Sequence, residues 1–140
     1  MAVDLTIIQK RLQKLEEYIK ILREYQTVPL EKFKQDIQIH STVERQFELA
    51  IECILDIGNH IIAAQSFRSP DDYRDFITVL GEEDIIPQDF AKSFAPVANF
   101  RNILAHEYIT LDLDIVYQHL QADLDDFVKF AKYISKYLQL

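Results

Sequence analysis

Apolar residues recur every three or four positions along most of the chain, which is the spacing of an amphipathic helix. The first such stripe follows Asp4, an expected N-cap, and consists of Leu5, Ile8, Leu12, Leu15, Ile19 and Leu22. Pro29 marks a break, and a second helix is expected over about residues 30–65, bent or solvated near its polar stretch at 38–45. Its stripe contains Phe33, Ile37, Phe47, Ile51, Ile54, Leu55, Ile61 and Ile62.

Three further helical segments complete this pattern. Ser69 as N-cap and Pro70 in the first turn predict a short helix that Gly81 ends, with a stripe of Tyr73, Phe76, Ile77 and Leu80. A segment from Pro87 to about Tyr108 contains Pro96, which should kink or divide it because proline has no N–H for the helical ladder. A last helix, capped by Thr110 or Asp112, has its apolar positions at Val116, Leu120, Leu124, Phe127, Ala131, Ile134 and Leu138. The pattern predicts an all-α, up-and-down bundle of about five helices in a single domain, residues 1–140.

The composition agrees with a chain that makes few turns. Two glycines and four prolines leave too few turn residues for a many-stranded sheet. Cys53 is the only cysteine, so the chain has no intrachain disulfide and a reducing compartment is expected. No apolar stretch approaches the ~20 residues of a membrane span, so we expect a cytoplasmic protein without a membrane partner. A net charge of −8 argues against broad, non-specific nucleic-acid binding and leaves a local basic site open.

The segment from Phe100 to Tyr108 carries the candidate chemistry. On a helical wheel, Val97, Phe100, Ile103 and Leu104 form an apolar sector facing the core, so Arg101, Asn102, His106 and Tyr108 are expected on the accessible face. A histidine can move the proton of a ribose 2′-hydroxyl, and an arginine can bind a phosphate with two hydrogen bonds. These groups suit phosphodiester cleavage without a metal. Taken alone, however, such residues on one helix are most often a solvated surface.

Three blocks of sequence resemble a known family. The spacing Arg-Asn-x-x-x-His-x-Tyr from Arg101 to Tyr108 resembles the R-x4-H-x-Tyr motif of the HEPN superfamily, and within it the HepT toxins. The blocks at residues 57–63, 69–73 and 100–112 match that family in order and spacing. The resemblance therefore covers most of the chain.

The resemblance implies a dimeric HEPN-like helical bundle that acts as a metal-independent ribonuclease toxin on RNA. It also implies a partner, a minimal nucleotidyltransferase antitoxin that transfers AMP from ATP to the motif tyrosine. By position, Arg101 and His106 would be catalytic, Asn102 supportive and Tyr108 the AMP acceptor, with no cofactor. Pro96 departs from the continuous helix expected before Arg101.

Two other readings remain open beside the enzyme. The chain could be a non-catalytic helical module that docks a nucleotidyltransferase, or a purely structural bundle; the intact Arg101 and His106 pair favours the enzyme. Outside the motif, His60 is expected to pack within the protein and Cys53 to be a buried, inert thiol. His119 and Asp123 are i, i+4 neighbours, but two ligands make a poor metal site and we predict none.

Overall fold

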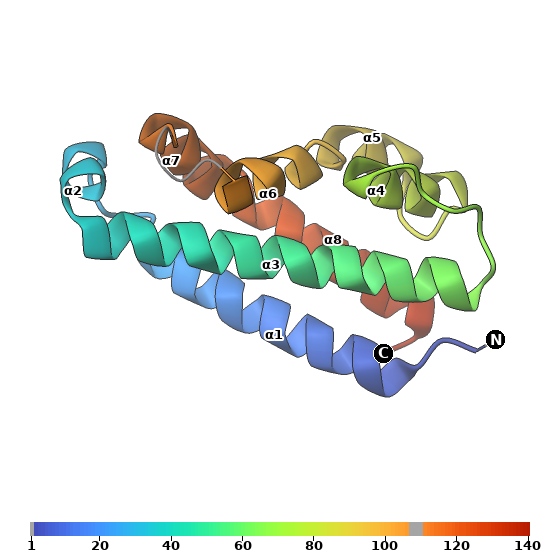
Figure 1. Cartoon of the computed structure of the whole chain (residues 1–140). Helices are drawn as coiled ribbons and strands as arrows, with labels where there is room; N and C mark the ends of the chain where they lie inside the picture. The colour runs from blue at the N-terminus through green and yellow to red at the C-terminus, as the bar shows by residue number, and fades with distance from the viewer. Residues whose placement is uncertain (1, 107–110) are drawn as a thin grey trace.

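The chain forms a bundle of helices that run back and forth along one axis (Figure 1). The computed structural model describes residues 2–106 and 111–140, and the side chain of His106 lies outside the described residues. Within the described residues all regular structure is helical. The helices are α1 (Leu5–Glu24), α2 (Leu30–Gln35), α3 (Ile37–Ala64), α4 (Tyr73–Glu82), α5 (Gln88–Phe94), α6 (Val97–His106), α7 (Leu113–Ala122) and α8 (Leu124–Leu138).

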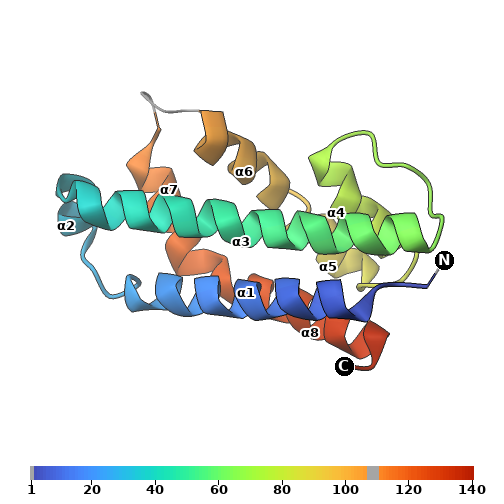
Figure 2. The same cartoon turned by 60° about the horizontal axis from the view of Figure 1, so that its bottom comes forward.

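The long helix α3 runs through the middle of this bundle. It packs along α1 on one side and against α4 and α6 on another, while α8 packs against α1. Figures 1 and 2 show that α1 and α3 lie side by side and antiparallel, and that the two chain ends lie at the same end of the bundle. The predicted all-α, up-and-down bundle is confirmed.

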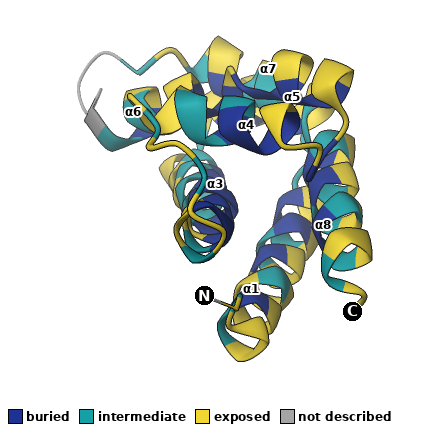
Figure 3. Ribbon diagram, turned by 90° about the vertical axis from the view of Figure 1, so that its right-hand side faces the viewer, coloured by how far each residue is buried: buried dark blue, intermediate teal, exposed yellow. Residues whose placement is uncertain are grey.

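Aromatic side chains join the helices at the core. Phe47 of α3 meets Phe100 of α6 and Phe127 of α8 edge to face, at ring-centroid distances of 5.3 and 5.9 Å. All three rings are almost fully buried. Figure 3 shows the buried residues on the inward faces of the helices. Phe47 thus joins α6, the helix of the candidate motif, to α3, and it also joins α3 to α8.

Two segments that the sequence pattern predicts to be single helices are each divided at an aspartate. Asp36 separates α2 from α3 because its backbone is extended and its side chain accepts a hydrogen bond from Gln38 N, which starts a new helix. Ile37 is consequently 68% exposed, so its assignment to the apolar stripe is wrong. The last segment also divides, at Asp123, into α7 and α8, although Asp123 has αR backbone and its side chain makes no cap hydrogen bond. The described residues therefore form eight helices rather than about five.

The predicted boundaries hold at some caps and fail at others. Asp4 and Asp112 cap α1 and α7 as expected. The cap of α4 is Asp72 rather than Ser69, since the Asp72 carboxylate accepts from Asp75 N. Gly81 lies inside α4, and no glycine in the described chain has a positive φ, so Gly81 is not a C-terminal cap.

Pro96 and the apolar content of the helices agree with what the sequence predicts. Pro96 lies between α5 and α6, so it divides the segment, which was one of the two predicted outcomes. No helix in the described part of the chain is long and apolar enough to cross a membrane.

Candidate active site around Arg101

The core holds the first turns of α6 firmly. Phe100 is 2% exposed and stacks on the imidazole of His119, with the ring centroids 3.9 Å apart. Val97 and Leu104 are also buried, as the helical wheel predicts. Ile103 is 37% exposed, so its predicted core position is wrong: it lies at the edge of the apolar sector. The backbone of Arg101, next to Phe100, is therefore well fixed.

The Arg101 side chain is held between α3 and α4. Its Nη2 donates to Oε1 of Glu52 on α3 at 3.2 Å, and its Cζ lies 5.2 Å from the ring centroid of Tyr73 on α4. Only 20% of the side chain is exposed. The expectation that Arg101 lies on an open face is thus wrong in detail, because neighbouring helices cover most of the side chain.

Of the other motif residues, the structure describes the side chain of Asn102 only. Asn102 is half-buried on α6. His106 is the last residue of α6, five positions after Arg101, and its side chain and Tyr108 lie outside the described residues. The predicted roles of Asn102, His106 and Tyr108 stay predictions.

Glu52 and Tyr73 were not singled out as site residues from the sequence. Glu52 is a lone acid within the apolar run at 50–55, which was one available signal. Tyr73 was assigned to the apolar stripe of its helix, yet it is 45% exposed and lies in one of the family-like blocks. Its place in that block is the second signal, because the exposure of Tyr73 is visible only in the structure.

An ionic cluster fixes the start of α4, where Tyr73 lies. The Arg68 guanidinium binds both carboxylate oxygens of Asp75, at 2.7 and 2.8 Å, and both of Glu82 at 2.9 Å. The hydrogen bonds from Arg68 lower the pKa of Asp75 to about 2 and also lower the pKa of Glu82. The cluster ties the loop before α4 to both ends of that helix.

The other residues considered from the sequence, Cys53, His119 and His60, are buried or half-buried. Cys53 is buried, and that burial raises its pKa to about 11, as expected for an inert thiol. His119 packs on Phe100, and its Nδ1 is hydrogen-bonded to Asp123. His60 is half-buried on α3. Among the side chains that the structure describes, which exclude that of His106, no three from His, Cys, Asp or Glu are grouped as a metal site requires.

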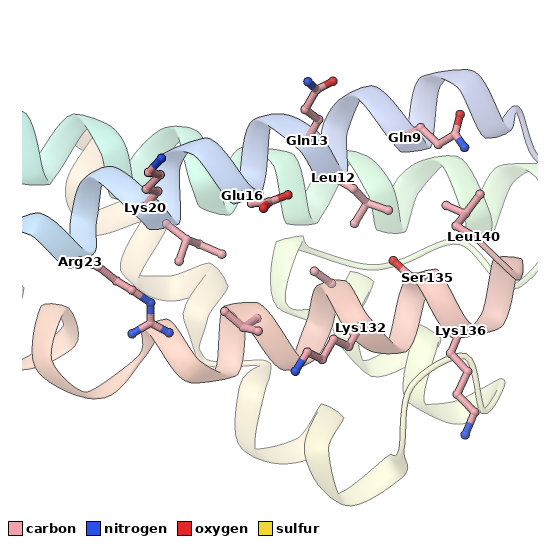
Figure 4. Close-up of a pocket in the computed structure, with 13 residues that line it drawn as sticks. Gln9, Leu12, Gln13, Glu16, Lys20, Arg23, Lys132, Ser135, Lys136 and Leu140 are labelled. Atoms are coloured by element: carbon pink, nitrogen blue, oxygen red, sulfur yellow. The ribbon is translucent and has the colours of Figure 1, made fainter.

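A broad groove among the described residues lies elsewhere. It has a volume of about 920 Å³ and runs between α1 and α8 (Figure 4). Leu12, Ile19 and Val128 contribute apolar surface, and Lys20 and Lys132 contribute charge. None of its lining residues comes from α3, α4 or α6, so the groove is separate from Arg101.

Comparison with known proteins identifies the family. A family model described as "Ribonuclease HepT-like" matches residues 15–134, which is most of the chain. The chain belongs to the HepT-like ribonuclease family. The family that three short blocks indicated in the sequence is thereby confirmed, and the helical run containing Arg101 lies inside the matched region of this HepT-like chain.

Individual HepT relatives agree with this assignment. The chain is 34% identical over 104 residues to the mRNA nuclease HepT of Shewanella oneidensis, covering 74% of this chain and 78% of the relative. It is 27% identical over 137 residues to the tRNA nuclease HepT of Aphanizomenon flos-aquae, covering 97% and 92%. A solved structure of the tri-AMPylated Shewanella oneidensis HEPN toxin in complex with MNT antitoxin has a TM-score of 0.83 at 30% identity, covering 93% of this chain and 97% of that one.

Proposed function

We propose that this chain is a metal-independent endoribonuclease that acts as the toxin of a toxin–antitoxin pair. The observation that carries the proposal is the Arg101 side chain. It is a mostly covered cation in a fixed position, five residues before His106, in a chain of the HepT-like family. A shielded guanidinium attracts phosphate more strongly than one in open water, because the local dielectric constant is lower.

The proposed reaction is an internal transfer within RNA. His106 takes the proton of a ribose 2′-hydroxyl, and the 2′-oxygen attacks the adjacent phosphorus. The bond from phosphorus to the 5′-oxygen breaks, the leaving oxygen receives a proton from water, and the His106 imidazolium returns its proton to the solvent. The products are a 2′,3′-cyclic phosphate and a 5′-hydroxyl. Arg101 stabilises the charge that develops on the phosphoryl oxygens, and Asn102 orients the imidazole of His106.

We infer that the active form is a homodimer. Arg101 and His106 are about 140° apart on an ideal helix, so one copy presents an incomplete phosphate cleft. A two-fold axis beside α6 would bring two such pairs to one groove. The exposed Ile103 on the same helix offers an apolar contact for that interface. A sedimentation mass of one chain in a cleaving sample would contradict this arrangement.

We also propose that AMP transfer to Tyr108 neutralises the toxin, with a minimal nucleotidyltransferase as the partner. An AMP ester would add a negative phosphate near Arg101 and compete with the substrate phosphate. Co-expression with the partner should add AMP-sized mass increments on Tyr108 and stop cleavage. Tyr108→Phe should keep cleavage and resist silencing. If the partner silences the Phe variant equally well without modifying it, neutralisation occurs by complex formation.

The test of the function is RNA cleavage and growth inhibition by paired variants. Arg101→Ala and His106→Ala should abolish both effects, and cleavage by the parent should persist in EDTA. Arg45→Ala and His40→Ala are matched controls, because these residues pair with Glu48 and Glu44 on α3 rather than belonging to the motif. Controls should cleave like the parent. A folded parent that binds the partner but cleaves no RNA would instead favour the non-catalytic docking module.

A further inference from the structure

The surroundings of Arg101 suggest a role for two residues outside the motif. We propose that Glu52 and Tyr73 are positioning residues, which together hold the Arg101 guanidinium in the orientation that receives the RNA phosphate. The inference deepens the proposed function and rests on it. It assigns neither residue a contact with the reacting atoms.

The two contacts restrain different motions of the guanidinium. Glu52 accepts a hydrogen bond from Nη2 at 3.2 Å, which fixes the direction in which the group points. The Tyr73 ring lies 5.2 Å from Cζ, which restrains the plane of the group through a cation–π contact. An arginine side chain has several flexible torsions, so one contact alone would leave it a choice of orientations. Two contacts from two different helices leave far less freedom.

The supporting residues are themselves held in place. Tyr73 stacks on Phe76 with an interplanar angle of 21°, and it begins α4 within the cluster formed by Arg68, Asp75 and Glu82. Glu52 lies on α3 between buried Ile51 and Cys53, which fix its backbone. The guanidinium is therefore held by neighbours that are anchored before any substrate arrives, which is the requirement for preorganised stabilisation of charge.

The arrangement still leaves donors for a phosphate. A guanidinium has five N–H groups; the hydrogen bond to Glu52 uses one on Nη2, and Nε is buried, so the other Nη groups are the donors proposed for the phosphate. The Glu52 carboxylate is 39% exposed, so solvent weakens its competition for the charge of Arg101. Glu52 therefore orients the arginine without neutralising it. Its removal is expected to misplace the arginine rather than to activate the enzyme.

Four variants separate positioning from a general structural role. Tyr73→Phe keeps the ring and should cleave RNA like the parent. Tyr73→Leu removes the ring and should lower kcat between about 2-fold and about 30-fold, the factor that corresponds to the ~0.5–2 kcal/mol of a cation–π contact. Glu52→Gln keeps a hydrogen-bond acceptor, so its kcat should stay within about 3-fold of the parent value. Glu52→Ala removes the acceptor, so its kcat should be lower than the parent value by more than that factor. KM should change less than kcat, because the charge of Arg101 remains.

Two controls match these variants in type and location. Tyr137→Leu removes an exposed tyrosine on α8, and Glu48→Gln alters a glutamate one turn before Glu52 that pairs with Arg45. Both should leave kcat and KM unchanged. Equal losses in Tyr137→Leu and Tyr73→Leu would overturn the assignment of Tyr73, because the effect would then follow the loss of any tyrosine.

A second readout does not depend on cleavage. The Nε–H signal of Arg101 in a ¹H–¹⁵N NMR spectrum can be assigned by its loss in Arg101→Lys. In the parent it should be shifted by the ring current of Tyr73. The shift should persist in Tyr73→Phe and Tyr137→Leu and disappear in Tyr73→Leu.

The two readouts distinguish the two proposals. An Arg101 signal that is the same in the parent and in Tyr73→Leu would overturn the positioning role. A kcat that rises in Glu52→Ala would overturn it too, because Glu52 would then be a competitor for Arg101. A parent that cleaves no RNA, but whose Arg101 Nε–H signal is shifted and loses that shift in Tyr73→Leu, would refute the proposed activity and still support the orientation of Arg101 by Tyr73.

Discussion

Gly81 provides a sharp test of the packing between α4 and α5. A Cβ built on Gly81 would lie 2.5 Å from the Cβ of Ala91, whereas carbon atoms in contact are separated by about 3.5–4.0 Å. Both atoms are attached directly to backbone, so α5 would have to move by about 1 Å. Gly58 offers a matched control on α3, since its added Cβ would lie 3.4 Å from Leu80 Cδ1, the end of a flexible side chain.

The expected free energies follow from these distances. Overpacking a core costs about 1–3 kcal/mol, and we take the upper half of that range because neither Cβ can rotate away. Replacing a helical glycine by alanine also stabilises the folded chain by about 1 kcal/mol, because alanine has the higher helix propensity, and this gain offsets part of the overpacking cost. Gly81→Ala should therefore lower the free energy of unfolding by about 1–2 kcal/mol. Gly58→Ala should leave it unchanged or raise it by up to about 1 kcal/mol.

Thermal unfolding followed by circular dichroism measures both variants. For a chain of this length, Gly81→Ala should lower Tm by about 3–8 °C, and Gly58→Ala should not lower it. Ala91→Gly removes the opposing Cβ, so in that background Gly81→Ala should become stabilising by about 1 kcal/mol. If Gly81→Ala destabilises the chain equally with and without Ala91→Gly, the close approach to Ala91 is not the cause of the loss.

Three further predictions concern individual side chains. The folded-state pKa of Asp75, about 2, lies below its ordinary value of 3.8, so the stability it contributes is present above about pH 4 and is lost as the pH falls toward 2. The Tm difference between the parent and Arg68→Gln should therefore shrink over that range; a constant difference would contradict the ionic account. Cys53 should not react with iodoacetamide at pH 8 until the chain is denatured, since burial raises the pKa of its thiol to about 11; rapid labelling of the folded chain would contradict this. Arg101→Ala should lower the free energy of unfolding by about 1 kcal/mol, because the side chain contacts Glu52 and Tyr73, and a loss no larger than that of Arg45→Ala would show that these contacts contribute little.

Much of the fold could be predicted because helical periodicity is a local property. The stripes that bury Leu15, Phe47 and Phe127 follow directly from spacing, and Pro29 and Pro96 act through backbone geometry. Asp36 and Asp123 were missed because an aspartate is tolerated inside a helix as well as at its cap. Only the surrounding packing decides between these positions.

In the site, too, only features set by residues close in sequence could be predicted. The motif from Arg101 to Tyr108 is contiguous, so its spacing can be read from the sequence. Glu52 and Tyr73 are separated from Arg101 by 49 and 28 positions, and their contacts with it exist only because α3 and α4 both pack against α6. The burial of Arg101 could not be predicted for the same reason: an ideal wheel describes one helix and contains no neighbours.

Activation of the ribose 2′-hydroxyl by His106 can be tested by the cleavage of two RNAs that differ only at the 2′-position. The purified chain, in EDTA, is incubated with an oligoribonucleotide that it cleaves and with the same sequence carrying 2′-O-methyl groups, and the product ends are identified by mass spectrometry. The unmodified RNA should yield 2′,3′-cyclic phosphate and 5′-hydroxyl ends, the methylated RNA should stay intact, and His106→Ala should cleave neither. Cleavage of the methylated RNA, or of the unmodified RNA by His106→Ala, would contradict this mechanism.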